Sequence, residues 1–220
     1  MTELVNKRVT MNRALTEYML AQAEPPISSQ QWLIDATAAL GASAEMQIPH
    51  EQAVLLSFLA DIANAVTIVE VGTFTGYSTL ALALGLKAGG VVHTYDISSE
   101  WSGIASKAWA DAGVADRIKR YTGPALDGLA ALPAGQFVDM AFIDADKAGY
   151  VDYWNELVPR IRSGGLILAD NVLYSGEVVS AAPSHNALAI VEFNAHVRAD
   201  DRVESVLLPI SDGLTIARKK

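Results

Sequence analysis

The sequence predicts an α/β fold, in which a doubly wound, mostly parallel sheet of seven strands follows a set of extra N-terminal helices. Two observations lead to this prediction. From residue 67 onward, short runs rich in β-branched residues alternate with helical patterns, which is typical of βαβ units. The first five of these runs are largely apolar rather than alternating, apart from 118–121 with Lys119 and Arg120, as strands that are buried on both faces are. A chain of 220 residues suits a single domain.

Three stretches near the N-terminus have the apolar spacing of helices. The first ends before Pro25, the second begins near Ser28, which can cap a helix, and the third begins at Pro49. These helices are too short to form a domain of their own. We therefore interpret residues 1–64 as a helical cover on an α/β core of residues 65–220, within one domain.

The remaining elements are predicted from runs that alternate along the chain. Short runs rich in β-branched and apolar residues indicate five strands, at residues 67–71, 91–95, 118–121, 137–143 and 166–169. Helical patterns between and after them indicate helices at residues 78–86, 100–112, 125–132, 150–161 and 187–197. The last two runs, 203–208 and 214–217, flank a tight turn and are expected to pair as an antiparallel hairpin.

The composition excludes several classes of protein. Lys and Arg number 16 against 25 Asp and Glu, a net charge of −9, which disfavours a broad face for nucleic acid or for an anionic membrane. The chain has no cysteine, so a disulfide, a thiolate metal site and a cysteine nucleophile are all excluded. The first residues lack the apolar core of a signal peptide. We therefore expect a cytoplasmic protein that binds neither nucleic acid nor membrane.

A glycine turn follows the first predicted strand. The spacing of Gly72 and Gly76 is that of neither a phosphate-binding Walker loop nor the G-x-G-x-x-G turn of dinucleotide-binding proteins. Asp96 ends the second strand, at the separation of about 20 residues where an acid can hydrogen-bond ribose hydroxyls. A ligand with a ribose but no diphosphate fits both features, and S-adenosylmethionine is such a ligand. The alternative is a glycine turn and a strand-end acid that bind nothing.

Polar side chains also follow the fourth and fifth predicted strands. Asp144 ends one strand, and Asp170 and Asn171 end the next, so three oxygen donors are expected at one rim of the sheet. Such donors suit Mg²⁺, Mn²⁺ or Ca²⁺. Lys147, near the same rim, is a candidate base. The alternatives are that the strand-end residues cap the next helix or turn and that Lys147 is a surface lysine.

Six blocks of sequence resemble one enzyme family and occur in its order. They are V-E-V-G-T-F-T-G-Y-S from residue 69, Y-D-I from 95, G-P-A from 123, F-I-D-A-D-K from 142, D-N-V-L from 170 and D-G-L-T from 212. From about Met46 to the C-terminus, the chain resembles the cation-dependent class I O-methyltransferases, the caffeoyl-CoA and catechol O-methyltransferase-like enzymes. The resemblance implies a Rossmann-like sheet, methyl transfer from S-adenosylmethionine to a catechol-like small molecule, a divalent cation (Mg²⁺ foremost) and a homodimer. The N-terminal helices would then cover the active site or form the dimer interface.

The resemblance also implies roles for single residues. Lys147 is the implied catalytic base or its helper, with Asp144 beside it. The residues implied to contact S-adenosylmethionine are Met46, Glu70, Gly72, Thr73, Ser78, Asp96, Ala125 and Asp144. Those implied to hold the cation are Asp144, Asp170 and Asn171. Those implied to contact the acceptor are Met46, Lys147, Tyr174 and Asp212.

Two departures from the family pattern bear on the acceptor. Tyr174 stands where bacterial members often have Trp, and residues 179–186 lack the family's charged, Asp-rich run. Basic residues that could grip a coenzyme A phosphate are not evident in the sequence either.

Other functions fit the predicted fold less well. A nucleotide-dependent oxidoreductase is disfavoured because the G-x-G-x-x-G turn is missing. An RNA methyltransferase is disfavoured by the net charge of −9. A non-catalytic cofactor-binding protein would have no need of the polar residues at the later strand ends, and that set is intact.

Overall fold

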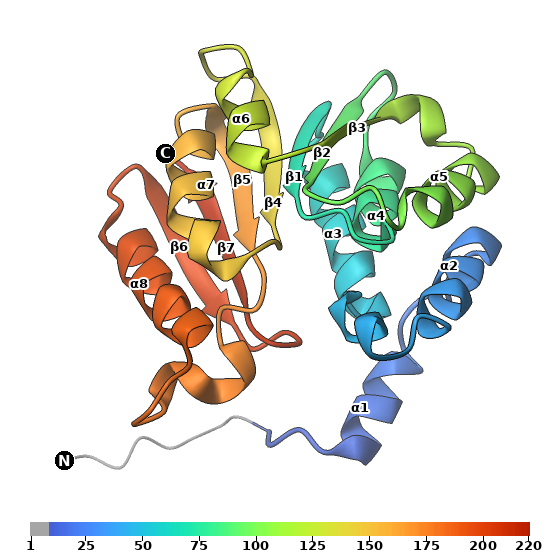
Figure 1. The fold of residues 1–220 in the computed structure, drawn as a ribbon, viewed down its shortest axis with the longest axis horizontal. Helices are drawn as coiled ribbons and strands as arrows, with labels where there is room; N and C mark the ends of the chain where they lie inside the picture. The colour runs from blue at the N-terminus through green and yellow to red at the C-terminus, as the bar shows by residue number, and fades with distance from the viewer. Residues whose placement is uncertain (1–8) are drawn as a thin grey trace.

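The structure is a computed structural model, and it describes residues 9–220. One seven-stranded sheet lies between two sets of helices (Figure 1). No helix among residues 9–220 is long and apolar enough to cross a membrane. The first eight residues, to which the expectation of a missing signal peptide mainly refers, lie outside the described part of the chain.

In the described chain, which starts at residue 9, three α-helices and a short 3₁₀ helix precede the sheet. They are α1 (Arg13–Leu20), α2 (Ser28–Ala38), η1 (Gly41–Met46) and α3 (His50–Ile62). The N-cap of α2 is Ile27 rather than the expected serine, and its N–H donates to Gln30 Oε1 at 3.1 Å. Leu33 of α2 and Leu56 of α3 belong to the same buried apolar cluster as the sheet, so these two helices pack onto the core.

The sheet has five parallel strands and a C-terminal antiparallel pair, which confirms the fold predicted from the sequence. The strands are β1 (Thr67–Val71), β2 (Val91–Asp96), β3 (Ile118–Thr122), β4 (Val138–Ile143), β5 (Ile161–Ala169), β6 (Val203–Leu208) and β7 (Leu214–Lys219). Their order across the sheet is β3-β2-β1-β4-β5-β7-β6. Strand β7 runs antiparallel to both of its neighbours, β5 and β6.

Helices connect the strands and cover both faces of the sheet. They are α4 (Tyr77–Gly85), α5 (Ser102–Asp111), α6 (Ala125–Ala130), α7 (Tyr150–Leu157) and α8 (His185–Ala199), with short 3₁₀ turns η2 (Ala115–Arg117), η3 (Lys147–Gly149) and η4 (Tyr174–Val179). Helices α3, α4 and α5 lie on one side, and α6, α7 and α8 lie on the other (Figure 1).

Each face of the sheet has its own apolar cluster, because successive side chains of a strand point to opposite faces. In β4, Phe142 packs with α3, α4 and α5, whereas Ile143 packs with α7 and α8. The second cluster also holds Trp154 and Phe193, whose ring centroids lie 5.7 Å apart. Each fully buried large side chain stabilises the fold by about 1.5–3 kcal/mol. Burial on this scale lets the chain fold without a disulfide.

Two elements differ from their sequence-based expectation. Strand β5 begins at Ile161 rather than at residue 166, and α7 ends correspondingly earlier, at Leu157. The start of β5 contains Ser163-Gly164-Gly165, and the pairing register with β4 shifts there.

Helix α3 exposes two of its large apolar residues, since Phe58 is 61% and Ile62 58% exposed. Its buried residues are Gln52, Ala53, Leu56 and Ala60.

The strand order places a crevice between β1 and β4. The chain runs outward from β1 through β2 to β3 and then returns to β4 on the other side of β1. In open α/β sheets, ligands bind at such a reversal, beyond the carboxyl ends of the strands. Backbone bonds join the strand ends: Asp144 N–H donates to the Val71 carbonyl at 2.8 Å, and Gly72 N–H to the Tyr95 carbonyl at 2.9 Å.

Candidate active site

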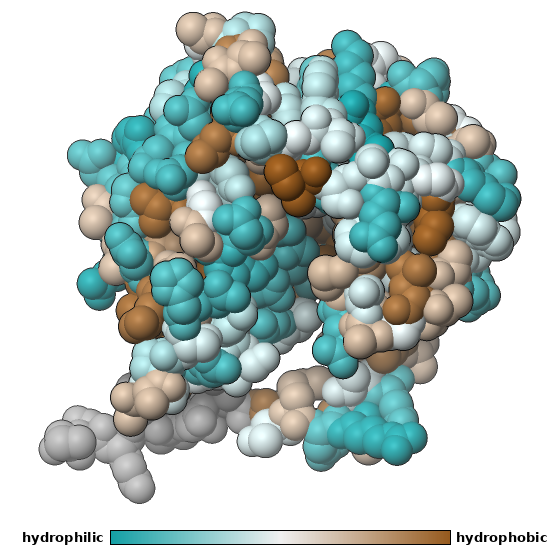
Figure 2. All heavy atoms as spheres, viewed as in Figure 1, coloured by the Kyte–Doolittle hydropathy of each residue, from teal (hydrophilic) through white to brown (hydrophobic). Residues whose placement is uncertain are grey.

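A cavity of about 1560 Å³ opens at the carboxyl ends of β1, β2, β4 and β5. Figure 2 shows a hollow between the two sides of the molecule, with hydrophilic residues inside it. Residues of η1 and of the segment leading into α3 line the cavity, as do residues of η4 and of the turn between β6 and β7. Ligand pockets are commonly about 300–1,000 Å³, so this cavity has room for a nucleoside ligand and a second small molecule.

The glycine turn forms the cavity wall after β1. Gly72 has a φ of 101°, and a Cβ at this position would overlap the carbonyl oxygen of Asp144. Gly76 has a φ of 83°, and a Cβ there would lie 2.7 Å from the Trp109 ring. Both positions therefore need glycine for space as well as for conformation.

The carboxylate of Asp96 holds this turn from the end of β2. Its Oδ2 accepts the N–H groups of Thr73 at 3.0 Å and Phe74 at 2.8 Å. Its Oδ1 accepts the N–H of Ser98 at 2.8 Å. The side chain also lines the cavity, so Asp96 supports the turn and faces the ligand space at the same time.

Glu70 differs from the other predicted site residues because it lies behind the cavity wall. Its side chain is fully buried, and its Oε2 accepts the hydroxyl protons of Thr79 and, at 2.6 Å, Thr94. Its Oε1 has no hydrogen-bond partner in the described part of the chain. Burial raises the pKa of this carboxyl to about 7, although hydroxyl donors, Ser78 first among them, oppose the rise.

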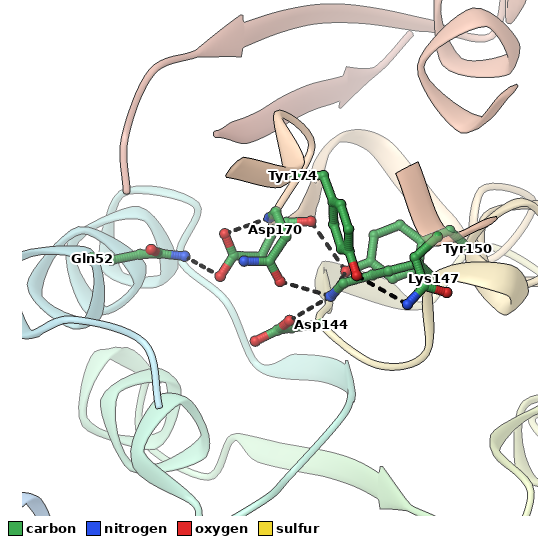
Figure 3. A network of polar contacts seen from close by, with 8 residues as sticks. Gln52, Asp144, Lys147, Tyr150, Asp170 and Tyr174 are labelled. Carbon is green, nitrogen blue, oxygen red and sulfur yellow. Dashed lines mark hydrogen bonds and ion pairs between the residues drawn. The ribbon is translucent and has the colours of Figure 1, made fainter. Parts of the chain in front are cut away.

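Lys147 lies at the centre of the polar cluster after β4 (Figure 3). Its Nζ donates to Asp144 Oδ1 at 3.2 Å, to Asn171 Oδ1 at 2.7 Å and to Tyr150 Oη at 2.8 Å. An ammonium group has three N–H bonds, so all of them are used within the cluster. The Lys147 and Asp144 side chains are 12% and 18% exposed, so this ion pair is largely shielded from solvent.

Asp170 is the most deeply buried carboxylate of the cavity, at 2% exposure. Its Oδ1 accepts the N–H of Asn171, and its Oδ2 accepts Nε2 of Gln52, both at 2.7 Å. Burial, and then the charge of Asp144, raise the pKa of Asp170 to about 7. The sequence reasoning missed Gln52, whose signal is a polar residue in the otherwise apolar buried stripe of α3.

Tyr150 is a second site residue that the sequence analysis did not predict. It is fully buried, and its hydroxyl donates to the Asp170 carbonyl at 3.1 Å while it accepts from Lys147. Burial, with the nearby carboxylates, raises the pKa of this phenol well above its usual value, so it stays protonated. Tyr150 thus links the ends of β4 and β5 through hydrogen bonds.

The opposite wall is built on a left-handed backbone segment. Tyr174 and Ser175 have φ values of 44° and 51°, which non-glycine residues rarely adopt. The Tyr174 hydroxyl accepts Nδ2 of Asn186 at 3.0 Å, and the Ser175 N–H donates to Asp212 Oδ1 at 2.5 Å. These bonds hold the aromatic ring of Tyr174 at the edge of the cavity. Strained backbone of this kind is common at functional sites.

The cavity gathers almost every residue that the sequence singled out. Glu70 alone is not on its wall; those that line it are Met46, Gly72, Thr73, Ser78, Asp96, Ala125, Asp144, Lys147, Asp170, Asn171, Tyr174 and Asp212. No group of three or more His, Cys, Asp or Glu side chains arranged for a metal occurs among residues 9–220. The oxygen cluster at the strand ends has two carboxylates, and its third member is the amide of Asn171.

The cavity wall is strongly acidic. Lys147 is the one basic residue on the wall within the described chain. The acidic residues on it are Glu45, Asp96, Glu100, Asp144, Asp146, Asp170, Glu177 and Asp212. Because the N–H groups of Lys147 are already used, an anionic group on a ligand would meet no free positive charge on this wall.

Comparison with known proteins gives consistent matches over most of the chain. A family model described as O-methyltransferase matches residues 23–220. Probable caffeoyl-CoA O-methyltransferase 2 of Dictyostelium discoideum is 36% identical over 217 residues, which cover 96% of this chain and 94% of that protein. Tricin synthase 2 of Oryza sativa subsp. japonica is 39% identical over 188 residues. That match covers 79% of this chain but only 63% of the rice protein, less than two thirds of its length.

A solved structure resembles the whole fold. The O-methyltransferase from Bacillus cereus in complex with SAH superimposes with a TM-score of 0.85 and 31% sequence identity. The similarity covers 94% of this chain and 97% of the Bacillus chain, so it includes the sheet and the helices on both faces.

Proposed function

The chain belongs to the O-methyltransferase family, and we propose that it transfers a methyl group from S-adenosylmethionine to one hydroxyl of a catechol-like small molecule, aided by a divalent cation. The observation that carries this proposal is the convergence of Asp144, Lys147 and Asn171 in one cavity with Asp96 and the glycine turn. One end of the cavity then suits a nucleoside, and the other offers acids and an amine.

The nucleoside end supports S-adenosylmethionine as the methyl donor. A carboxylate has about four lone-pair sites, so Asp96 keeps acceptor capacity for a ribose hydroxyl after its three backbone contacts. Ala125, at the start of α6, lines the cavity where the resemblance implies the adenine. Gly72 and Ser78 line the cavity, where they would contact the methionine part. The Bacillus cereus relative, described in complex with SAH, supports the same assignment.

The other end fits a divalent cation by the chemistry of its donors. Oδ1 of Asp144 and Oδ1 of Asn171 accept from one cationic centre, Nζ of Lys147, and Asp170 directly precedes Asn171 in the chain. Carboxylate and amide oxygens suit Mg²⁺, with Mn²⁺ and Ca²⁺ as alternatives. We assign Asp144, Asp170 and Asn171 as the residues that would hold it. When bound, the cation supplies positive charge that favours the ionised form of a chelating diphenol.

The chain's own residues then act as base and as walls. Lys147 first gives a proton to solvent, and its amine then takes the proton of the acceptor hydroxyl while Tyr150 keeps Nζ in place. The hydroxyl oxygen forms a bond to the methyl carbon as the bond from that carbon to sulfur breaks, which leaves S-adenosylhomocysteine and a protonated Lys147. Tyr174, Asp212 and Met46 frame the acceptor, so that oxygen, carbon and sulfur are held in line.

The exposed side of α3 supports a homodimer. Phe58 and Ile62 lie one helical turn apart and are both more than half exposed. We propose that this side of α3 contacts a second copy of the chain in a homodimer. Light scattering tests this proposal: the unsubstituted protein should be a dimer, and Phe58→Ser should be a monomer.

We also propose that residues 1–64 belong to the same domain as the core.

Two measurements on the purified protein test the proposed reaction. The first is calorimetric titration with S-adenosylmethionine, for which we expect micromolar affinity. The second is methyl transfer to a simple catechol, which we expect with Mg²⁺ and not in the presence of a chelator.

The variant Asp144→Ala serves as the control for the cation. It should lose Mg²⁺-dependent turnover, and full activity restored by added Mg²⁺ would contradict the assignment. Binding of S-adenosylmethionine without turnover of any catechol would contradict the acceptor class. No binding of S-adenosylmethionine would contradict the whole proposal.

A further inference from the structure

We infer that Gln52 is a positioning residue of the cation site, because its side-chain amide fixes the orientation of the Asp170 carboxylate. The inference rests on the proposed function, in which Asp170 is one of the residues that hold the cation. Gln52 neither lines the cavity nor belongs to the polar segments after the strands. It would act on the cation only through Asp170.

The contact joins two distant parts of the chain. Gln52 lies in the first turn of α3, its side chain is fully buried, and its Nε2 lies 2.7 Å from Asp170 Oδ2. Figure 3 shows it reaching Asp170 from α3, on the side away from Lys147 and Tyr150. The position of α3 is therefore coupled to the orientation of one oxygen donor.

The remaining contacts of Asp170 come from its own neighbourhood. Its Oδ1 accepts the N–H of the next residue, Asn171, and its backbone carbonyl accepts the hydroxyl of Tyr150. These bonds fix the backbone and one carboxylate oxygen. Gln52 holds the other oxygen, so without it the plane of the carboxylate would have one polar anchor.

Gln52 is a neutral hydrogen-bond donor, whereas the group that holds the other two cation-binding side chains is a charged ammonium. Asp144 and Asn171 accept from the ammonium group of Lys147, whereas Asp170 accepts from an amide. A neutral donor orients a carboxylate without neutralising its charge. Asp170 therefore stays available for a cation in the arrangement that Gln52 holds.

The other atom of the same amide shows that packing alone does not explain this residue. Gln52 Oε1 is buried and has no hydrogen-bond partner among residues 9–220. A buried polar atom without a partner costs stability, and an apolar residue of the same length, such as Met, would avoid that cost. A glutamine at this position is thus worse for the core and useful for Asp170.

The test compares Gln52→Met with the unsubstituted protein in a titration with Mn²⁺ alone, followed by electron paramagnetic resonance. Loss of a partner behind a metal ligand typically weakens binding by about 10–100-fold, and we expect a loss of at least about 10-fold here. Affinity for S-adenosylmethionine, measured by calorimetry, should stay the same. In turnover assays, the Mn²⁺ concentration for half-maximal rate should rise while kcat at saturating Mn²⁺ recovers.

Two further variants keep the test decisive. Leu56→Met changes a buried residue one turn along α3 that has no polar atom, and it should leave Mn²⁺ affinity unchanged. Gln52→Asn keeps the amide but shortens its reach, and it should weaken Mn²⁺ binding even if Gln52→Met does not fold.

Three outcomes would overturn the inference. Unchanged Mn²⁺ affinity in a folded Gln52 variant would do so and leave the proposed function intact, provided that Asp170→Asn loses Mn²⁺. An equal loss of affinity for Mn²⁺ and S-adenosylmethionine would assign Gln52 a structural role only. An unsubstituted protein that binds no Mn²⁺ would overturn the cation in the proposed function, and this inference with it.

Discussion

At the scale of single residues, Lys147 is the most constrained group of the site, with three acceptors around Nζ. Replacement by Met keeps the length and burial of the side chain but removes the amine. We expect Lys147→Met to lower kcat by roughly 10²–10⁴-fold, the usual contribution of a positioned base, and to leave affinity for S-adenosylmethionine unchanged. Methyl-transfer rates and calorimetry measure the two effects.

The exposed Lys119 on β3 offers a matched control for that substitution. Lys119→Met removes the same charge from the molecule far from the polar cluster and should leave kcat unchanged. Equal losses in the two variants would mean that charge in general, rather than the amine of Lys147, supports turnover.

Glu70 gives the protein a pH-dependent stability. Burial raises its pKa from 4.5 to about 7 in the folded protein, whereas the unfolded chain releases the proton near 4.5. Between these values the folded state binds more protons, so its stability is greatest at the acidic end and falls as the pH rises through about 7. The full effect is on the order of 3 kcal/mol.

The variant Glu70→Gln isolates this effect, because glutamine has the shape of the protonated acid and does not titrate. Its melting temperature should lack the part of the decline between pH 4.5 and about 7 that Glu70 causes. Thermal unfolding by circular dichroism at several pH values checks this. Parallel curves for the two proteins would mean that Glu70 is ionised in the folded state.

The polar residues in and behind the cavity wall fall into two groups, those that the sequence indicates and those that it does not. Asp144 and the pair Asp170-Asn171 could be predicted because they directly follow apolar runs, and parallel strands end at one rim. Gln52 and Asn186 could not, because each lies in a helix whose orientation toward the rim is set by tertiary packing. Their partners are known only once α3 and α8 are placed on the sheet.

At the scale of elements, the turn between β1 and α4 fits one backbone shape. Gly72→Ala would force a Cβ into the Asp144 carbonyl and would strain a φ of 101°. We expect a destabilisation of about 1–3 kcal/mol from the overpacking alone, and a loss of affinity for S-adenosylmethionine as the turn shifts. Thermal unfolding and calorimetric titration measure these losses.

Gly89 makes a close control for Gly72, since its φ is 77° and a Cβ there would meet nothing within 4 Å. Gly89→Ala should cost only the conformational strain and should leave affinity for S-adenosylmethionine unchanged. A normal affinity in Gly72→Ala would show that the approach of the turn to β4 does not matter for the ligand.

The bounds of a strand could be predicted where its β-branched and apolar residues form a clearly bounded run. Strand β1 begins and ends at the expected residues because Thr67–Val71 is rich in β-branched residues and is followed by Gly72. The start of β5 was hidden, since Arg162 and two glycines interrupt its apolar run. Arg162 is accommodated at the sheet margin by an ion pair with Asp139 at 2.6 Å. The charged Arg162 thus has its partner on the neighbouring strand β4. The sequence of β5 alone does not reveal that partner.

At the scale of the whole molecule, charge limits which acceptors can enter. The protein has a net charge of −9, and Lys147 is the one basic residue on the described cavity wall. Two unit charges about 4 Å apart near a protein surface interact with about 4 kcal/mol, so even partial repulsion affects binding strongly. Several relatives are named for caffeoyl-CoA, an acceptor that carries phosphate groups.

We expect the protein to prefer an uncharged catechol to its carboxylated counterpart by about 10-fold or more in kcat/KM. A tenfold difference in kcat/KM needs only about 1.4 kcal/mol of repulsion between the carboxylate and the cavity wall. The comparison should use a catechol carboxylate and its methyl ester, which differ mainly in charge, together with caffeoyl-CoA. Added salt should narrow the difference, since the Debye length falls from about 10 Å at 0.1 M to about 3 Å at 1 M. Asp212→Asn removes one acidic group at the acceptor end and should further reduce the preference for the uncharged catechol. A preference for the carboxylate or for caffeoyl-CoA at low salt would mean that the positive charge of the proposed cation and of the sulfonium of S-adenosylmethionine outweighs the acidic wall of the cavity.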